Sequence, residues 1–196
     1  MSEPLSPGPL PHLLAQLALR YEEERHGDRW GPFARSVLSL LPRAAREVAP
    51  HLTAKASVGQ RSWATVPWLA MMDPSLTITV TRGVYLVALI AEGRVHLGLV
   101  HGAQDLCRTH GWPEGRAILR RRAASIRVTL ADHVERFGDR IALGSPNDLP
   151  RAYEAAWVFG RSFETAGLDG PAFDADLDAL LSAYADYTER TLPEAA

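Results

Sequence analysis

The middle of the chain, residues 55–102, brings together side chains that are suited to recognition. A turn-forming run, Gly59-Gln60-Arg61-Ser62, is flanked there by Trp63 and Trp68. Glycine lets a backbone approach a ligand closely, amide and guanidinium groups bond to base edges, and aromatic rings stack on bases. No acid–base set accompanies these residues. The composition therefore predicts a surface that reads a nucleic-acid base rather than a catalytic centre.

The sequence lacks the usual signatures of catalysis and metal binding. Its one lysine, Lys55, does not end a glycine-rich turn, as a phosphate-binding loop requires. No GxSxG motif occurs, and His101, Cys107 and His110 form the only close group of metal-type ligands. We therefore expect no metal, no cofactor and no catalysis by this chain alone.

A run of arginines predicts contacts with phosphate. Arg116, Arg120 and Arg127 are spaced four and seven residues apart, which places them on one face of a predicted helix. Such a face suits a phosphate backbone, although a merely solvated helix face has the same pattern. The expected phosphate contacts are Lys55, Arg82, Arg116, Arg120 and Arg121.

Charge is distributed unevenly along the chain. The net charge is −2, but residues 55–127 carry ten Lys or Arg against four Asp or Glu, and the remainder carries eleven against nineteen. A basic middle with acidic flanks is expected where one face of a protein binds phosphate. Solvated helices that simply differ in charge would give the same distribution. Because 20 of the 21 basic residues are arginine, position carries more weight than number.

Length and composition predict a single domain with a sizeable core, since the chain has 196 residues of which 46% are hydrophobic. Its longest apolar runs are too short to span a bilayer, and its first residues lack the basic region of a signal peptide. The single cysteine, Cys107, excludes an internal disulfide. We therefore expect a cytoplasmic protein with no membrane partner.

The apolar pattern predicts an α+β fold, in which a central, mostly antiparallel sheet is flanked by N-terminal and C-terminal helices. Residues 1–11 hold four prolines and a glycine, which predicts a flexible lead before a domain at 12–192. The predicted helices are 12–24, 32–41, 42–48, 104–110, 113–137, 149–165 and 172–190. The predicted strands are 52–58, 64–72, 76–81, 84–91, 94–100 and 141–143. Alternation in the hairpin at Glu92-Gly93 predicts a half-buried sheet.

An ordered series of motifs runs through the central stretch. Ser57-Val58-Gly59-Gln60 is followed by Trp63, Val66-Pro67-Trp68, Asp73-Pro74, Gly83-Val84-Tyr85, Leu89, Val95-His96-Leu97 and Gly102. In this order and spacing they resemble the MrcB-like domain family, which includes the N-terminal DNA-binding domain of McrB-type restriction specificity subunits. A weaker match continues through Tyr153-Glu154, Phe163, Asp176-Leu177 and Tyr184.

The resemblance implies that the chain binds double-stranded DNA carrying a modified cytosine, which is flipped into a pocket. A nuclease or NTPase domain or subunit would be its partner. The implied base pocket consists of Trp68, Tyr85 and Leu89. The implied DNA-contacting loop consists of Ser57, Gly59, Gln60, Arg61, Ser62 and Trp63. Apolar walls would replace the lost stacking of the flipped base. The archetype has an aromatic residue where this chain has Gln60, so the target stays open among 5-methylcytosine, hydroxymethylcytosine and N4-methylcytosine.

Two other interpretations fit the same residues. Trp63, Trp68 and Tyr85 also suit an ordinary core, as in a protein-interaction domain on this fold. A small-molecule enzyme could use the same aromatic pocket. A deep pocket at Trp68 and Tyr85 with a basic rim would favour the DNA reader. A packed sheet face would favour the interaction domain, and a carboxylate–histidine pair in the pocket would favour the enzyme.

Overall fold

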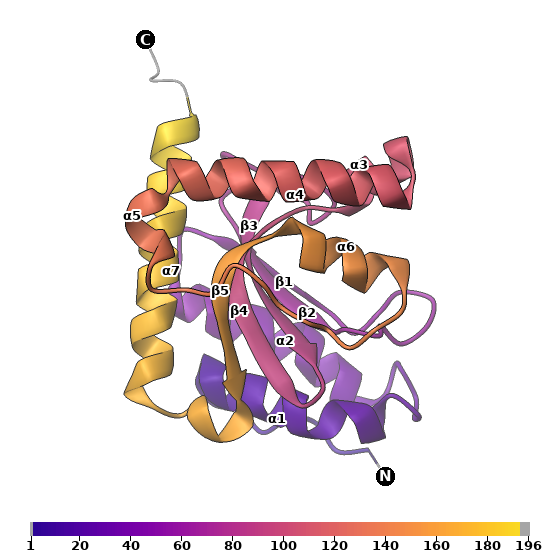
Figure 1. Ribbon diagram of the computed structural model, residues 1–196. Helices are drawn as coiled ribbons and strands as arrows, with labels where there is room; N and C mark the ends of the chain where they lie inside the picture. Colours follow the sequence, from indigo (N-terminus) through magenta and orange to yellow (C-terminus); the bar gives the residue numbers. More distant parts are fainter. Residues whose placement is uncertain (1, 193–196) are drawn as a thin grey trace.

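A five-stranded antiparallel sheet with helices on both sides forms the centre of the computed structural model, which describes residues 2–192 (Figure 1). The strands are β1 (Thr53–Ser57), β2 (Trp68–Met72), β3 (Val84–Ala91), β4 (Arg94–His101) and β5 (Trp157–Glu164), adjacent in that order. The helices are α1 (Leu10–Glu24), α2 (Pro32–Val48), α3 (Gln104–His110), α4 (Trp112–Thr129), α5 (Ala131–Val134), α6 (Asp148–Ala156) and α7 (Pro171–Thr191), with a 3-10 turn η1 (Thr165–Gly167). The predicted α+β fold is confirmed.

Helices cover both faces of the sheet. On one face Tyr85 of β3 meets Tyr153 of α6, and on the other Phe163 of β5 packs against Phe173 of α7 with 5.2 Å between ring centroids. Figure 1 shows α4 and α6 side by side in front of the sheet and α2 behind it. All of β3 and all of β4 except Arg94 are buried. The predicted half-buried sheet is therefore wrong, because strands covered on both faces are apolar throughout.

Two glycines in the sheet let the segment before α6 pack closely. A Cβ on Gly98 or Gly160 would lie 2.5 Å from the Trp157 indole, so only glycine leaves room for this ring. The indole Nε1–H of Trp157 donates to the Gly138 carbonyl at 3.3 Å, and Gly138 exchanges two backbone hydrogen bonds of 2.9 Å with Gly160. The chain is thereby fixed beside β5 as it leaves α5.

The largest difference from the sequence prediction lies at residues 149–165, where one helix was expected. The structure has α6 followed directly by β5, with Trp157 at the junction in an extended conformation (φ −64°, ψ 120°). No glycine or proline separates the two elements. The only local signal is the run Trp157-Val158-Phe159, because aromatic and β-branched residues favour strands.

Smaller differences have local causes. Residues 32–48 form one helix although Pro42 lies inside it, because the buried stripe from Phe33 to Ala45 continues across the proline. The helix expected at 113–137 ends at Thr129 and resumes as α5. No strand forms at 76–81, where the Thr77 hydroxyl bonds to backbone carbonyls of Thr79 and Arg82 instead. None forms at 141–143 either.

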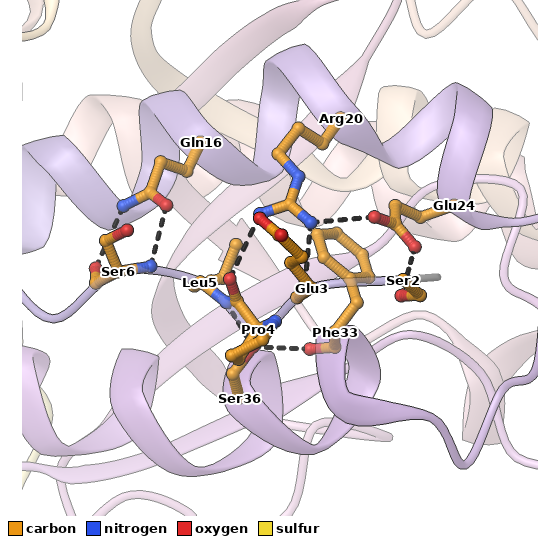
Figure 2. Close-up of polar contacts among 10 residues, drawn as sticks. All are labelled: Ser2, Glu3, Pro4, Leu5, Ser6, Gln16, Arg20, Glu24, Phe33 and Ser36. Atoms are coloured by element: carbon orange, nitrogen blue, oxygen red, sulfur yellow. Dashed lines mark hydrogen bonds and ion pairs between the residues drawn. The ribbon is translucent and has the colours of Figure 1, made fainter.

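The N-terminal residues 2–9 pack along α1 and α2 (Figure 2). Leu5 is only 2% exposed. The Gln16 side chain brackets Ser6, since Nε2 donates to its carbonyl at 2.9 Å and Oε1 accepts from its N–H at 2.8 Å. The described part of the predicted flexible lead at 1–11 is thus anchored, because Leu5 gives it an apolar side chain to bury. Met1 lies outside the described residues.

Candidate nucleic-acid interface

The loop between β1 and β2 has a shape that only glycine permits. Gly59 has φ 109°, and an added Cβ would lie 2.0 Å from the Ser62 carbonyl oxygen. The Ser57 hydroxyl accepts the Gly59 N–H at 3.0 Å, and the Ala64 N–H closes the loop on the Val58 carbonyl at 2.7 Å. Of the four residues between Gly59 and Ala64, the first three, Gln60, Arg61 and Ser62, are exposed.

Trp63 anchors this loop to α1. Its Nε1–H donates to the Gly27 carbonyl at 3.1 Å, and its ring meets the Tyr21 ring edge-on at 5.7 Å. The Tyr21 hydroxyl in turn donates to the Ala64 carbonyl at 2.6 Å. Burial raises the pKa of Tyr21, so this donor keeps its proton. Trp63, for which the sequence predicts a DNA contact, is half-buried and holds the loop against Tyr21 of α1.

The turn between α1 and α2 adds two residues that sequence reasoning missed. Arg29 Nη1 donates to the carbonyls of Gly59, at 3.2 Å, and Gln60. Its guanidinium also lies over the Trp30 ring, 4.4 Å from the centroid, and Trp30 is 61% exposed. The signal in the sequence is a tryptophan between the predicted helices 12–24 and 32–41, because tryptophan is highly buried on average and is unusual in a polar connection. We call Arg29, Trp30, Gln60, Arg61 and Ser62 the loop surface.

The predicted base-pocket residues share one side of the sheet. Trp68 is paired directly with Leu89 in the β2–β3 register, and Tyr85 lies four residues from Leu89 on the same strand. Tyr85 and Leu89 are each only 1% exposed, however, whereas Trp68 is half-buried. The Tyr85 hydroxyl donates to the Val80 carbonyl at 2.8 Å, and burial raises its pKa well above the usual range. In this conformation Tyr85 and Leu89 are therefore closed off, and of the three residues only Trp68 is partly accessible.

A histidine that sequence reasoning left without a partner extends the same row. His96 is paired with Leu89 on one side and with Ser162 on the other, so the row runs from Trp68 to β5. His96 Nδ1 lies 2.7 Å from the Ser162 hydroxyl oxygen. Burial, with a smaller effect of Arg94, lowers the pKa of His96 to about 4. The row therefore holds a neutral polar side chain at neutral pH.

A cleft lies between α4 and α6, which run parallel. Arg116 of α4 pairs with Asp148 at the start of α6 at 2.7 Å, and Arg127 donates to the Trp157 carbonyl just beyond α6 at 3.1 Å. The cavity between the helices has a volume of about 470 Å³. Its lining includes the arginines Arg116, Arg120, Arg127, Arg140 and Arg151. We call these five residues and the space between them the arginine cleft.

The remaining predicted phosphate contacts lie elsewhere. Arg121 pairs with Glu114 at 3.3 Å on α4 and does not line the cleft. Lys55 on β1 donates from Nζ to the Ile78 carbonyl at 2.8 Å. Arg82 is exposed in the irregular segment before β3. The structure thus brings together Arg116 and Arg120 but not the five predicted residues.

The described residues contain no group of three His, Cys, Asp or Glu side chains placed to hold a metal ion. One carboxylate–histidine pair joins α5 to α7, where His133 Nε2 lies 2.6 Å from Asp186. Neither residue belongs to the row around Trp68, so the observation that would favour an enzyme is not met there. Within residues 2–192, no helix combines the length and apolarity needed to cross a bilayer.

An antiparallel sheet flanked by helices, with amide and guanidinium groups exposed on the β1–β2 loop and an exposed tryptophan in the neighbouring α1–α2 turn, has features expected of a nucleic-acid-binding domain. A family model described as "MrcB-like, N-terminal domain" matches residues 19–189. The chain belongs to this family, as its motifs predicted, and the membership supports a McrB-like DNA-binding module. No curated protein matches the chain.

Proposed function

We propose that the chain recognises a modified cytosine in double-stranded DNA by flipping it out of the duplex. The loop surface carries this proposal. It combines a glycine-dependent loop with an exposed, cation-stacked tryptophan and an exposed arginine. Hydrogen bonds that close the loop lower the ordering cost of binding, and these side chains are suited to base-edge contact and stacking.

In this proposal the loop surface enters the duplex. Gln60 or Arg61 bonds to base edges, and Trp30 supplies an aromatic face for an unstacked neighbour. The role of Trp30 fits the absence of an aromatic residue directly after Gly59. Ser57 and Gly59 shape the loop, and Ser62 lies beside its exposed tip.

The proposed base pocket uses the row behind this loop. Trp68 offers the accessible wall, while Leu89 and Tyr85 form the floor. Since Leu89 and Tyr85 are buried, the floor becomes available only when its cover moves. One crossing segment is 139–147, which runs in front of the sheet and is tied to the β1–β2 loop through Asn147 Nδ2 and Thr65 Oγ1 at 3.0 Å (Figure 1).

The proposal further assigns the chain to a modification-dependent restriction or defence system in the cytoplasm. In this assignment another domain or subunit supplies the nuclease or NTPase activity. Membership of a DNA-binding family supports this division of labour.

Fluorescence anisotropy with matched duplexes tests the proposal. The duplexes differ only at one cytosine, which is unmodified, 5-methylated, 5-hydroxymethylated or N4-methylated, and salt is held constant. Burying one methyl group is worth about 0.8 kcal/mol, so we expect about fourfold or greater preference for one modified form. A 2-aminopurine next to that cytosine should brighten on binding. Equal affinity for all four duplexes would contradict the proposal.

A protein-interaction domain is the second candidate, and one observation favours it. The sheet face at Tyr85 and Leu89 is packed, as this interpretation predicted. An interaction domain would bind none of the four duplexes with a modification preference. The same titration therefore separates the two candidates.

A further inference from the structure

Three of the five guanidinium groups in the arginine cleft lack a counter-ion from the part of the chain that the structure describes. Arg120, Arg140 and Arg151 have no ion pair or side-chain hydrogen bond among residues 2–192. By contrast, Arg116 is paired with Asp148, and Arg127 donates to two backbone carbonyls at 3.1 and 2.8 Å. The unpaired groups come from three different segments, α4, α6 and the connection between α5 and α6.

The cleft carries excess positive charge. Its lining holds five arginines against two acids, Asp139 and Glu154. Glu154 is already engaged, because its Oε1 accepts the Leu143 N–H at 2.7 Å. Guanidinium groups that face one cavity repel one another, and an anion between them relieves this repulsion. Such a concentration of like charge around a cavity is the electrostatic pattern of an anion site.

The chemistry of the lining selects the kind of anion. Arginine presents several N–H donors in a fixed fork, which matches the oxygens of phosphate. Along α4 the arginines extend from Arg116 to Arg127, a rise of roughly 16 Å at about 1.5 Å per residue. The remaining lining residues, Ile141, Ala155 and Trp157, are apolar. A cavity of about 470 Å³ is large enough for more than one phosphate group.

We propose that the arginine cleft binds phosphate groups. The proposal stands apart from modified-cytosine recognition, since it rests on the cleft and not on the loop surface. Phosphate has two possible sources here, the backbone of bound DNA or a free phosphorylated ligand. Asn147 supports the first source, because it directly precedes α6 and bonds to Thr65, so the start of α6 contacts the same β1–β2 connection that carries Gln60 and Arg61.

Inorganic pyrophosphate and an unmodified duplex are the two probes that test this site. Binding of each to the full chain is measured by titration calorimetry at constant ionic strength. The test variant is Arg120→Gln/Arg151→Gln, which removes two unpaired charges. The control is Arg43→Gln/Arg46→Gln on α2 behind the sheet, which changes net charge equally (Figure 1). Both pairs are exposed, so melting temperatures should match the parent chain.

We expect the parent chain and the control to bind pyrophosphate equally, and the cleft variant to bind at least about tenfold more weakly, because hydrogen bonds to charged groups are the strong ones. If DNA is the source, pyrophosphate competes with the duplex and the cleft variant weakens both. If a free ligand is the source, duplex affinity stays unchanged. Pyrophosphate binding that is undetectable in the parent, or equal in the cleft variant and the control, would overturn the proposal. Either result is independent of any preference for modified cytosine.

Discussion

Replacing Gly59 by alanine should damage the loop surface more than the fold. The φ of 109° is strained for any L-residue, at a cost on the order of 1–3 kcal/mol. The new methyl group would also lie 2.0 Å from the Ser62 carbonyl oxygen and 2.6 Å from the Ala64 nitrogen. The loop must therefore rebuild and lose bonds such as that from Ala64 to the Val58 carbonyl, each worth about 1 kcal/mol.

The total loss for Gly59→Ala is about 3 kcal/mol, or roughly 6–12 °C in Tm for a domain of this size. Gly93→Ala is the matched control, since Gly93 also has a positive φ of 71° but nothing lies within 4 Å of an added Cβ. The control should lose about 1 kcal/mol and keep its DNA affinity. Thermal unfolding followed by circular dichroism, together with duplex anisotropy, measures both effects. The reasoning fails if the two variants melt together or if Gly59→Ala binds the modified duplex like the parent chain.

Other predictions concern the row behind the loop and the exposed tryptophan. Tyr85→Phe should lower the free energy of unfolding by about 1 kcal/mol, because the hydrogen bond to the Val80 carbonyl is lost, and should keep the preference for modified DNA. Tyr85→Ala should lower the free energy of unfolding by about 3–5 kcal/mol and abolish that preference. Urea unfolding and anisotropy check both, and a Tyr85→Ala protein that keeps full discrimination would exclude Tyr85 from the pocket. Trp30→Ala should weaken duplex binding about tenfold, since stacking on a base is worth about 1–3 kcal/mol, and should leave Tm unchanged, since the ring is exposed. An unchanged affinity would exclude Trp30 from the interface. The pKa of His96 is about 4 in the folded chain and 6.5 ordinarily. As the pH falls, the imidazole is therefore protonated in the unfolded chain before it is protonated in the folded chain. Stability should therefore fall as pH drops from 6.5 toward 4, by up to about 3 kcal/mol, and His96→Gln should reduce that loss in urea titrations at the two ends of this range. An identical pH dependence in the variant would rule out His96 as a source.

The sequence was sufficient for the elements with strong local signals. The Glu92-Gly93 hairpin, α3 and the antiparallel sheet follow from periodicity and turn chemistry. It was insufficient for β5, because residues 157–164 become a strand through pairing with β4, which lies far away in the chain. Local propensity does not reveal that β4 has an unpaired edge, with which a segment later in the chain can form backbone hydrogen bonds.

The site shows the same division between local and long-range information. The turn at Gly59 was predicted from glycine and polar neighbours, and its positive φ agrees. The contribution of Arg29 and Trp30 depends on α1 and α2 packing beside β1, which is a tertiary contact. The sequence pattern around Tyr85 is the same whether the side chain lines a pocket or belongs to the core, and only its burial in the structure distinguishes the two. Arg140 and Arg151 join Arg120 only because α6 lies against α4.

The strand order also has a consequence for how the molecule assembles. Strands β1 to β4 are sequential neighbours, and each pair is joined by a connection of eleven residues or fewer. β5 pairs with β4 only after residues 102–156 have closed into a loop. Closing a longer loop costs more entropy, which slows the formation of this pair of strands. We expect β5, α4 and α6 to form a separate cooperative unit, whose amides exchange hydrogen before those of β2 to β4. Since this unit contains the arginine cleft, any anion bound there would tighten the last-formed part of the fold and slow its opening.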